Sequence, residues 1–86
     1  MSAQDKILTY LEANTNEWHT SGQLQFMDFK NEDGTRALPR TIVRRLQNLE
    51  EQSLIAVTYK NKRTQYRFIP KEWRDRYIPV SMRGNA

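Results

Sequence analysis

The sequence contains no cysteine and only one histidine, His19. Disulfides, thiolate chemistry and cysteine-based zinc sites are therefore excluded, and one histidine provides no ligand cluster for a catalytic metal. No apolar run approaches the roughly 20 residues of a membrane-spanning helix. The N-terminus has no basic segment followed by an apolar stretch, which is the pattern of a signal peptide. We therefore expect a cytoplasmic protein that is not an enzyme and has no metal, no cofactor and no membrane contact.

The chain has 86 residues, of which 37% are hydrophobic and 28% charged, with three glycines and three prolines. This balance is too apolar for a disordered chain and too polar for a membrane protein. A chain of this length corresponds to one small domain. We expect that domain to span residues 1–78, with residues 79–86 as a flexible tail.

The charge is distributed unevenly along the chain. Residues 1–35 contain two lysines and six carboxylates, whereas residues 36–86 contain twelve basic residues and four carboxylates. Nine of the fourteen basic residues are arginine, whose forked guanidinium suits phosphate and guanine. A basic half on a small domain indicates a polyanionic partner, although a solvated surface has the same composition.

The N-terminal half predicts two short helices. Ser2 and Asp5 have the spacing of a capping box, and Ile7, Leu8 and Leu11 follow at helical intervals, which predicts a helix over residues 3–13. A short extended stretch follows at residues 17–19, after which Thr20 and Ser21 can each cap a second helix. Residues 23–29 fit a helix or a strand, and we prefer the helix. Asp33-Gly34 indicates a turn in the polar connection from residue 30 to 37.

Residues 39–52 carry the strongest helix signal. Pro39 suits the first helical position, and Ile42, Leu46 and Leu49 form one apolar stripe. Ser53 stands where a left-handed C-cap favours glycine. The polar side chains opposite the stripe are Arg40, Arg44, Gln47, Asn48 and Glu51, with Thr41 on the flank.

The remaining chain predicts a β-hairpin. Ile55, Val57 and Tyr59 alternate within residues 54–59, a basic turn covers residues 60–64, and Tyr66 and Phe68 alternate within residues 65–69. After Pro70, residues 71–77 fit one or two helical turns. We assign Trp18, Ile55, Val57, Tyr66 and Phe68 to the core and His19 to the surface or to a cap. Four aromatic residues either complete the core or form a self-association surface: Phe26, Phe29, Trp73 and Tyr77.

Residues 39–55, PRTIVRRLQNLEEQSLI, resemble the recognition helix and following strand of winged helix-turn-helix regulators, a family common among prokaryotes and their viruses and plasmids. Members commonly show Val-x-Arg-x-Leu-x-x-Leu-Glu-x-x-Gly-Leu-Ile, which is matched here by Val43, Arg45, Leu46, Leu49, Glu50, Leu54 and Ile55. Ser53 replaces the usual glycine, and the connection before Pro39 is longer than the tight turn of the family. The resemblance implies an α+β winged helix, with a three-helix core and a C-terminal β-hairpin wing.

The resemblance further implies sequence-specific binding of double-stranded DNA by a transcriptional regulator that acts by occupying a site. The third helix enters the major groove, and the hairpin tip lies on the backbone or minor groove. The DNA-contacting residues carried over are Arg40, Thr41, Arg44, Gln47 and Asn48 on the helix and Lys60, Lys62 and Arg63 at the tip, with Arg67 on the outer face of the hairpin as a further phosphate candidate.

Other interpretations remain open for these residues. The helix face can be an ordinary solvated face, and charges at a sheet edge can serve to block aggregation. A homodimer through Trp73 and Tyr77 would match a palindromic site. The alternative function is a winged helix that serves as a protein–protein adaptor in a larger assembly.

Overall fold

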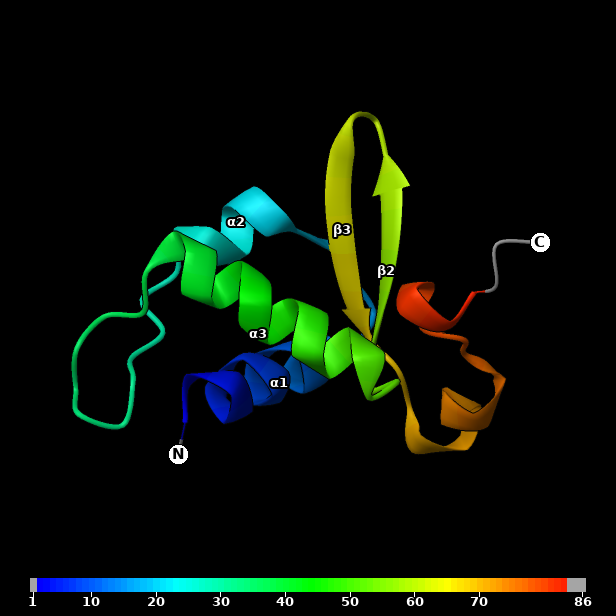
Figure 1. The fold of residues 1–86 in the computed structure, drawn as a ribbon, viewed down its shortest axis with the longest axis horizontal. Coiled ribbons are helices and arrows are strands. Elements are labelled where there is room, and N and C mark those ends of the chain that lie inside the picture. The colour runs from blue at the N-terminus through cyan, green and yellow to red at the C-terminus, as the bar shows by residue number, and fades with distance from the viewer. Residues whose placement is uncertain (1, 84–86) are drawn as a thin grey trace.

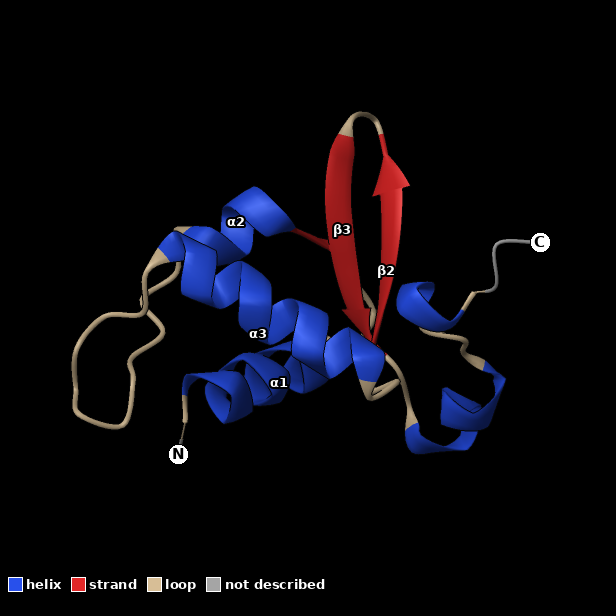
Figure 2. Cartoon of the chain, in the orientation of Figure 1, coloured by secondary structure: helices blue, strands red, loops and turns tan. Residues whose placement is uncertain are grey.

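The computed structural model describes residues 2–83, in which three α-helices and a small three-stranded antiparallel sheet form a mixed α+β fold (Figure 1). The expected α+β class is confirmed. Within residues 2–83, none of the helices has the length and apolar character needed to cross a membrane. The elements follow in the order α1 (Ala3–Ala13), β1 (His19–Thr20), α2 (Ser21–Gln25), α3 (Pro39–Glu51), β2 (Ile55–Lys60), β3 (Arg63–Phe68) and two 3₁₀ helices, η1 (Lys71–Arg76) and η2 (Val80–Met82) (Figure 2).

The two longer helices form where the sequence predicts them. Ser2 caps α1, because its Oγ accepts a hydrogen bond from the Asp5 backbone N–H at 3.2 Å while the Asp5 carboxylate accepts from the Ser2 N–H at 3.4 Å. Pro39 occupies the first turn of α3, where a missing N–H costs nothing. The Ser2 cap and Pro39 thus mark where the two helices begin.

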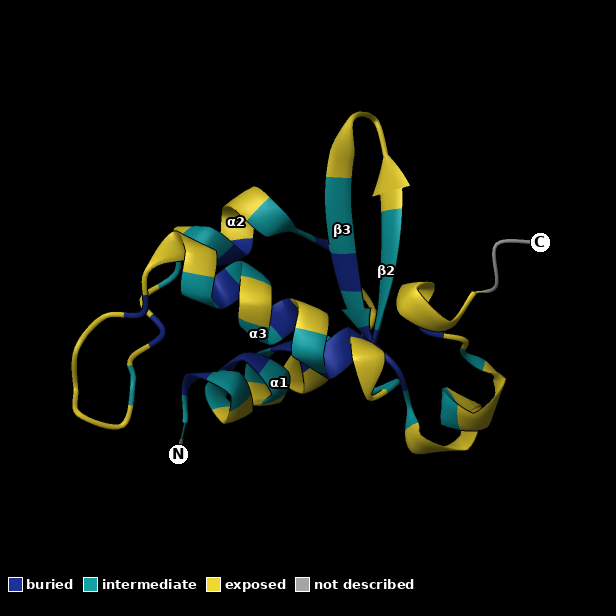
Figure 3. Ribbon diagram, in the orientation of Figure 1, coloured by how far each residue is buried: buried dark blue, intermediate teal, exposed yellow. Residues whose placement is uncertain are grey.

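The hydrophobic core lies where α1, α2, α3 and the sheet meet (Figure 3). The stripe of α3 is at its centre, since Ile42 and Leu46 are 0% exposed and Leu49 is 1% exposed. Side chains from every neighbouring element pack around the stripe: Ile7, Leu11, Leu24, Phe29, Ile55, Tyr66 and Phe68. The core assignment is therefore confirmed for Ile55, Tyr66 and Phe68, and Val57 packs on the core while remaining partly exposed.

The hairpin is longer and tighter than predicted. β2 and β3 pair from Ile55↔Phe68 to Lys60↔Arg63, so the turn is only Asn61-Lys62. Both turn residues have positive φ, 55° and 61°, as the twist of a two-residue hairpin requires. The prediction of a five-residue turn is therefore wrong. Asn61 tolerates the left-handed region, so the strands pair up to a turn of two residues.

Trp18 and His19 exchange the places that the sequence predicted for them. His19 is 2% exposed, with its Nε2 3.3 Å from the Asn14 carbonyl oxygen and its ring edge against Tyr10. Trp18 is 41% exposed. Successive side chains of a strand point to opposite faces, and β1 pairs His19 with Tyr66, so the histidine points inward. The assignment of Trp18 to the core is wrong, as is the surface alternative for His19, whereas its other alternative, a cap, fits the contact with the carbonyl of Asn14 at the C-cap of α1.

The helix predicted over residues 23–29 forms only in part. Thr20 caps α2 through its Oγ1, but the helix ends at Gln25, so the predicted helix does not extend to Phe29. Phe29 is buried in contact with Tyr10. The connection that follows is closed by a Lys30↔Arg36 bridge, and Gly34 takes a φ of +86° at the predicted turn.

The C-terminal segment packs where the sequence predicted a tail. Within the expected tail of residues 79–86, Pro79 is buried and residues 80–82 form η2, while residues 84–86 lie outside the described range. Trp73 is 52% exposed, with the Arg76 guanidinium 4.7 Å from its ring centre. Residues 70–83 are hereafter the C-terminal arm.

Glu50 of α3 anchors this arm. The carboxylate is 5% exposed, and its Oε2 accepts hydrogen bonds from the Tyr77 hydroxyl at 2.5 Å and from the Val80 backbone N–H at 2.9 Å. The Tyr77 oxygen in turn accepts from the Val57 N–H at 3.2 Å. Burial, and then the bond to Glu50, raise the pKa of Tyr77 from its ordinary value of 10.0 to about 12. Two donors thus offset the cost of burying the carboxylate.

Ser53 ends α3 in a left-handed conformation. Its φ is 60°, its N–H donates to the Glu50 carbonyl at 2.9 Å, and the Leu54 N–H donates to the Leu49 carbonyl at 3.1 Å. These two bonds form the Schellman motif, in which glycine is the usual residue. A Cβ at this position is strained.

We expect Ser53→Gly to raise the free energy of unfolding by about 0.5–1 kcal/mol, because glycine removes the Cβ strain at positive φ. Chemical denaturation of the two proteins provides the comparison. A loss of stability would show that the 3.4 Å contact from the Ser53 hydroxyl to the Tyr77 carbonyl outweighs the strain.

We expect Tyr77→Phe to lower the free energy of unfolding by about 1 kcal/mol at pH 8, since Glu50 then loses a donor. The raised pKa of Tyr77 adds a pH dependence. Its stabilising effect is complete below pH 10 and is lost as the pH rises towards 12. The difference between wild type and Tyr77→Phe in urea denaturation should therefore shrink from pH 9 to pH 12. Tyr66, whose pKa burial also raises, is present in both proteins and cancels. A difference that does not change with pH would contradict the proposed role of the hydroxyl.

Candidate nucleic-acid interface

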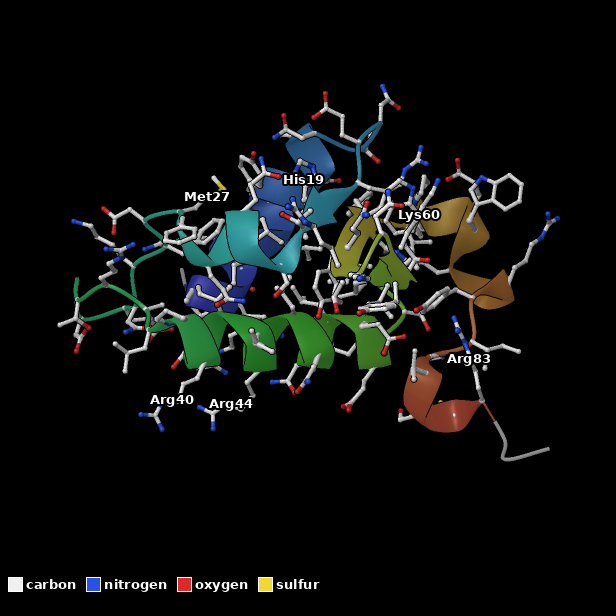
Figure 4. The ribbon with its side chains drawn as sticks, turned by 90° about the horizontal axis from the view of Figure 1, so that it is seen from above. His19, Met27, Arg40, Arg44, Lys60 and Arg83 are labelled. Atoms are coloured by element: carbon white, nitrogen blue, oxygen red, sulfur yellow. The ribbon has the colours of Figure 1, made fainter. Side chains whose placement is uncertain are left out.

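The solvent face of α3 carries arginine. Arg40, Arg44 and Gln47 are exposed, and Figure 4 shows the two arginines extending away from the body on the same side of the helix. Burial of the apolar stripe fixes this orientation, because residues on the opposite side of a helix necessarily face water. Within residues 2–83, neither arginine side chain makes a hydrogen bond or an ion pair that would occupy it.

The other two helix candidates lie on a different flank. Thr41 and Asn48 are partly buried, and the helical step of 100° per residue turns them away from the hairpin. Arg45 shares that flank and lines a hollow with Ser2 and Asp33. The structure therefore separates Thr41 and Asn48 from the set formed by Arg40, Arg44 and Gln47.

A hollow of about 330 Å³ separates α3 from the hairpin. The α3 side is lined by Val43, Gln47 and Glu50, and the hairpin side by Val57, Thr64 and Tyr66. Ser21 and Val80 close its ends. Gln47 is the only one of the predicted site residues that lines this hollow. Val43 also lines the hollow and was not predicted as a site residue, although its position one helical turn before Gln47 was a signal for it.

The hairpin tip carries the second group of cations. Lys60, Lys62 and Arg63 are all exposed at the end of the paired strands, and Figure 4 labels Lys60 on this hairpin. The two-residue turn keeps Lys60 and Arg63 directly opposite each other. In the part of the chain that the structure describes, these side chains have no carboxylate within ion-pair distance. The tip therefore concentrates positive charge in a small volume.

Arg67 is used within the fold. Its Nε donates a hydrogen bond to the Thr15 carbonyl oxygen at 2.9 Å, and the side chain is partly buried. The bond ties β3 to the loop between α1 and β1. Thr15 is far from Arg67 in the sequence, so no local pattern could predict this pairing. The hydrogen bond holds the Arg67 side chain away from the cations at the tip.

The described residues offer no cluster of side chains that could bind a metal ion. Within residues 2–83, no three His, Asp or Glu side chains gather closely enough to hold a metal ion. The buried polar groups Glu50 and His19 have internal partners.

Comparison with known proteins adds no relative. No model of a known family matches the chain, no curated protein is significantly similar to it, and no solved structure matches its fold significantly.

Proposed function

We propose that this chain is a winged helix that binds double-stranded DNA sequence-specifically and acts as a transcriptional regulator by occupying its site. In this proposal α3 enters the major groove and the hairpin tip is the wing, which lies on the backbone or minor groove. The order of helices and strands agrees with the arrangement that the sequence resemblance implies. The placement of the cations provides independent support.

One observation carries the proposal: two groups of unoccupied cations lie on separate elements that border one hollow. Arg40 and Arg44 are exposed on α3, while Lys60, Lys62 and Arg63 are exposed on the hairpin. If the polar face of α3 were only a solvated surface, there would be no reason for a second basic element to lie next to α3. Duplex DNA presents a groove edge and a flanking phosphate backbone, and two basic elements match this pair of features.

The residue types on α3 suit the edges of bases. Arginine donates two parallel hydrogen bonds to guanine, and glutamine pairs in the same manner with adenine. Among Arg40, Arg44 and Gln47, Arg44 lies furthest around α3 from the buried stripe and is the first candidate for guanine. Gln47, at the rim of the hollow, is the candidate for adenine.

A protein-binding adaptor is the second candidate, favoured by the apolar side chains of the C-terminal arm. Ile78 is 57% exposed and Met82 69% exposed, and Trp73 is half-exposed. Tyr77 is held by Glu50, so a homodimer through the arm would use Trp73 rather than Tyr77. An adaptor predicts association that depends only weakly on salt.

The salt dependence of binding to a random 20-base-pair duplex tests the proposed function. Each phosphate contact contributes about −0.9 to the slope of log K against log salt. Five cations bound to phosphates therefore predict a slope of about −4 to −5 for the wild type. No binding at low salt would contradict the proposal.

We expect Arg44→Ala to weaken binding to a selected high-affinity site by about 1–3 kcal/mol, with relaxed preference at one base pair. Arg44→Lys is the matched control. It keeps the charge but loses the fork, so it should keep most random-duplex affinity and still lose the base preference. Equal discrimination by all three proteins, measured by competition binding, would show that α3 does not read bases through this residue.

We expect the combined change Lys60→Ala, Lys62→Ala and Arg63→Ala to weaken binding to specific and random DNA alike. The salt slope should shrink by about one unit for each phosphate that the variant no longer binds. The control removes two lysines outside the hairpin, Lys30→Ala with Lys71→Ala, and should retain the wild-type slope. If the tip variant also retains that slope, the hairpin does not touch DNA.

A further inference from the structure

Phe26 is the most exposed aromatic residue among those the structure describes. It follows α2 at the C-cap and is 85% exposed, whereas Leu24 of the same helix is 0% exposed. At about 100° per residue, Phe26 lies on the opposite side of the helix from Leu24, so its ring points away from the core. Folding therefore leaves a large apolar side chain in water, and the internal packing gives no reason for it.

Two hollows flank this ring. One, of about 510 Å³, lies between α2 and the hairpin and contains Arg63 and Thr64. The other, of about 250 Å³, lies at the start of α3 and contains Arg36, with Leu38 as its apolar wall. Phe26 lines both, so it lies between the first turn of α3 and the hairpin end, which is also the place of α2 in Figure 1.

The charge around the Phe26 ring indicates the chemistry of the partner that would fit there. Each hollow is lined by one exposed arginine, and no carboxylate of residues 2–83 lines either of them. Leu38, 58% exposed, adds apolar surface on one side. A partner that fits must alternate negative charge with flat or apolar groups. A nucleotide strand has this alternation, since each sugar and base lies between two phosphates.

We propose that Phe26 packs against a nucleotide of the bound DNA, with the phosphates on either side held by Arg36 and Arg63. The inference rests on the proposed function and adds a third contact, outside the α3 arginines and the lysines of the tip. The contact is apolar, so its contribution to affinity is independent of counterion release. Salt dependence therefore separates it from every cationic contact.

Phe26→Ala tests the inference by binding to the random 20-base-pair duplex across a range of salt concentrations. Affinity should fall about fivefold at every concentration, because the variant no longer buries the phenyl ring against a deoxyribose of the duplex. The salt slope should not change. Phe26→Leu should keep part of the affinity, and Trp73→Ala, which removes another exposed aromatic side chain, should leave binding unaltered. The thermal midpoint of Phe26→Ala should match that of wild type, since the ring is exposed.

Three outcomes would overturn the inference. Wild-type affinity in Phe26→Ala would exclude the nucleotide contact and leave the proposed function standing. A changed salt slope in that variant would mean that its loss acts through the cations. Sedimentation that shows a wild-type dimer dissociated by Phe26→Ala would assign the patch to a second copy of the chain. Failure of the wild type to bind any duplex is a separate result, which contradicts the proposed function itself.

Discussion

Burial of one stripe on α3 determines how the rest of the chain is arranged. Ile42, Leu46 and Leu49 are almost completely excluded from water, and full burial of each such side chain contributes about 1.5–3 kcal/mol. α1, α2 and the strand pair pack around this stripe. The same constraint fixes the opposite face, because a helix that buries Ile42 and Leu46 must expose Arg40 and Arg44. The position of the candidate interface is therefore a direct consequence of core packing.

The second constraint is the buried carboxylate of Glu50. It lies at the C-terminal end of α3, where it binds the C-terminal arm through Tyr77 and Val80. A buried charge without these donors would cost several kcal/mol, so the arm and α3 stabilise each other. The arm reaches the hollow only through Val80, and the hairpin tip stays exposed. Fold stability and access to the basic surface are thus compatible.

The sequence predicted the features that depend on local patterns and missed those that depend on distant partners. The capping box at Ser2, the bounds of α3 and the left-handed Ser53 follow from spacing and residue type, and all three are present. The exchange of Trp18 and His19 depends on the register of β1 with β3, which no pattern within two residues can specify. The bond from Arg67 to Thr15 and the burial of Glu50 join residues far apart in sequence. Phe26 and Phe29 both belong to the helix predicted over residues 23–29, but α2 ends at Gln25, and Phe26 is exposed while Phe29 is buried.

The proposed interface consists of the α3 arginines, the hairpin tip and Phe26 between them. Backbone amide chemical shifts of the ¹⁵N-labelled protein, recorded during titration with a short random duplex, test this surface most directly. We expect the largest shifts to cluster in residues 40–47 and 60–64 and around Phe26, with small changes in α1 and η1. Shifts that cluster instead on the C-terminal arm around Trp73 and Ile78, or no shifts at low salt, would contradict it.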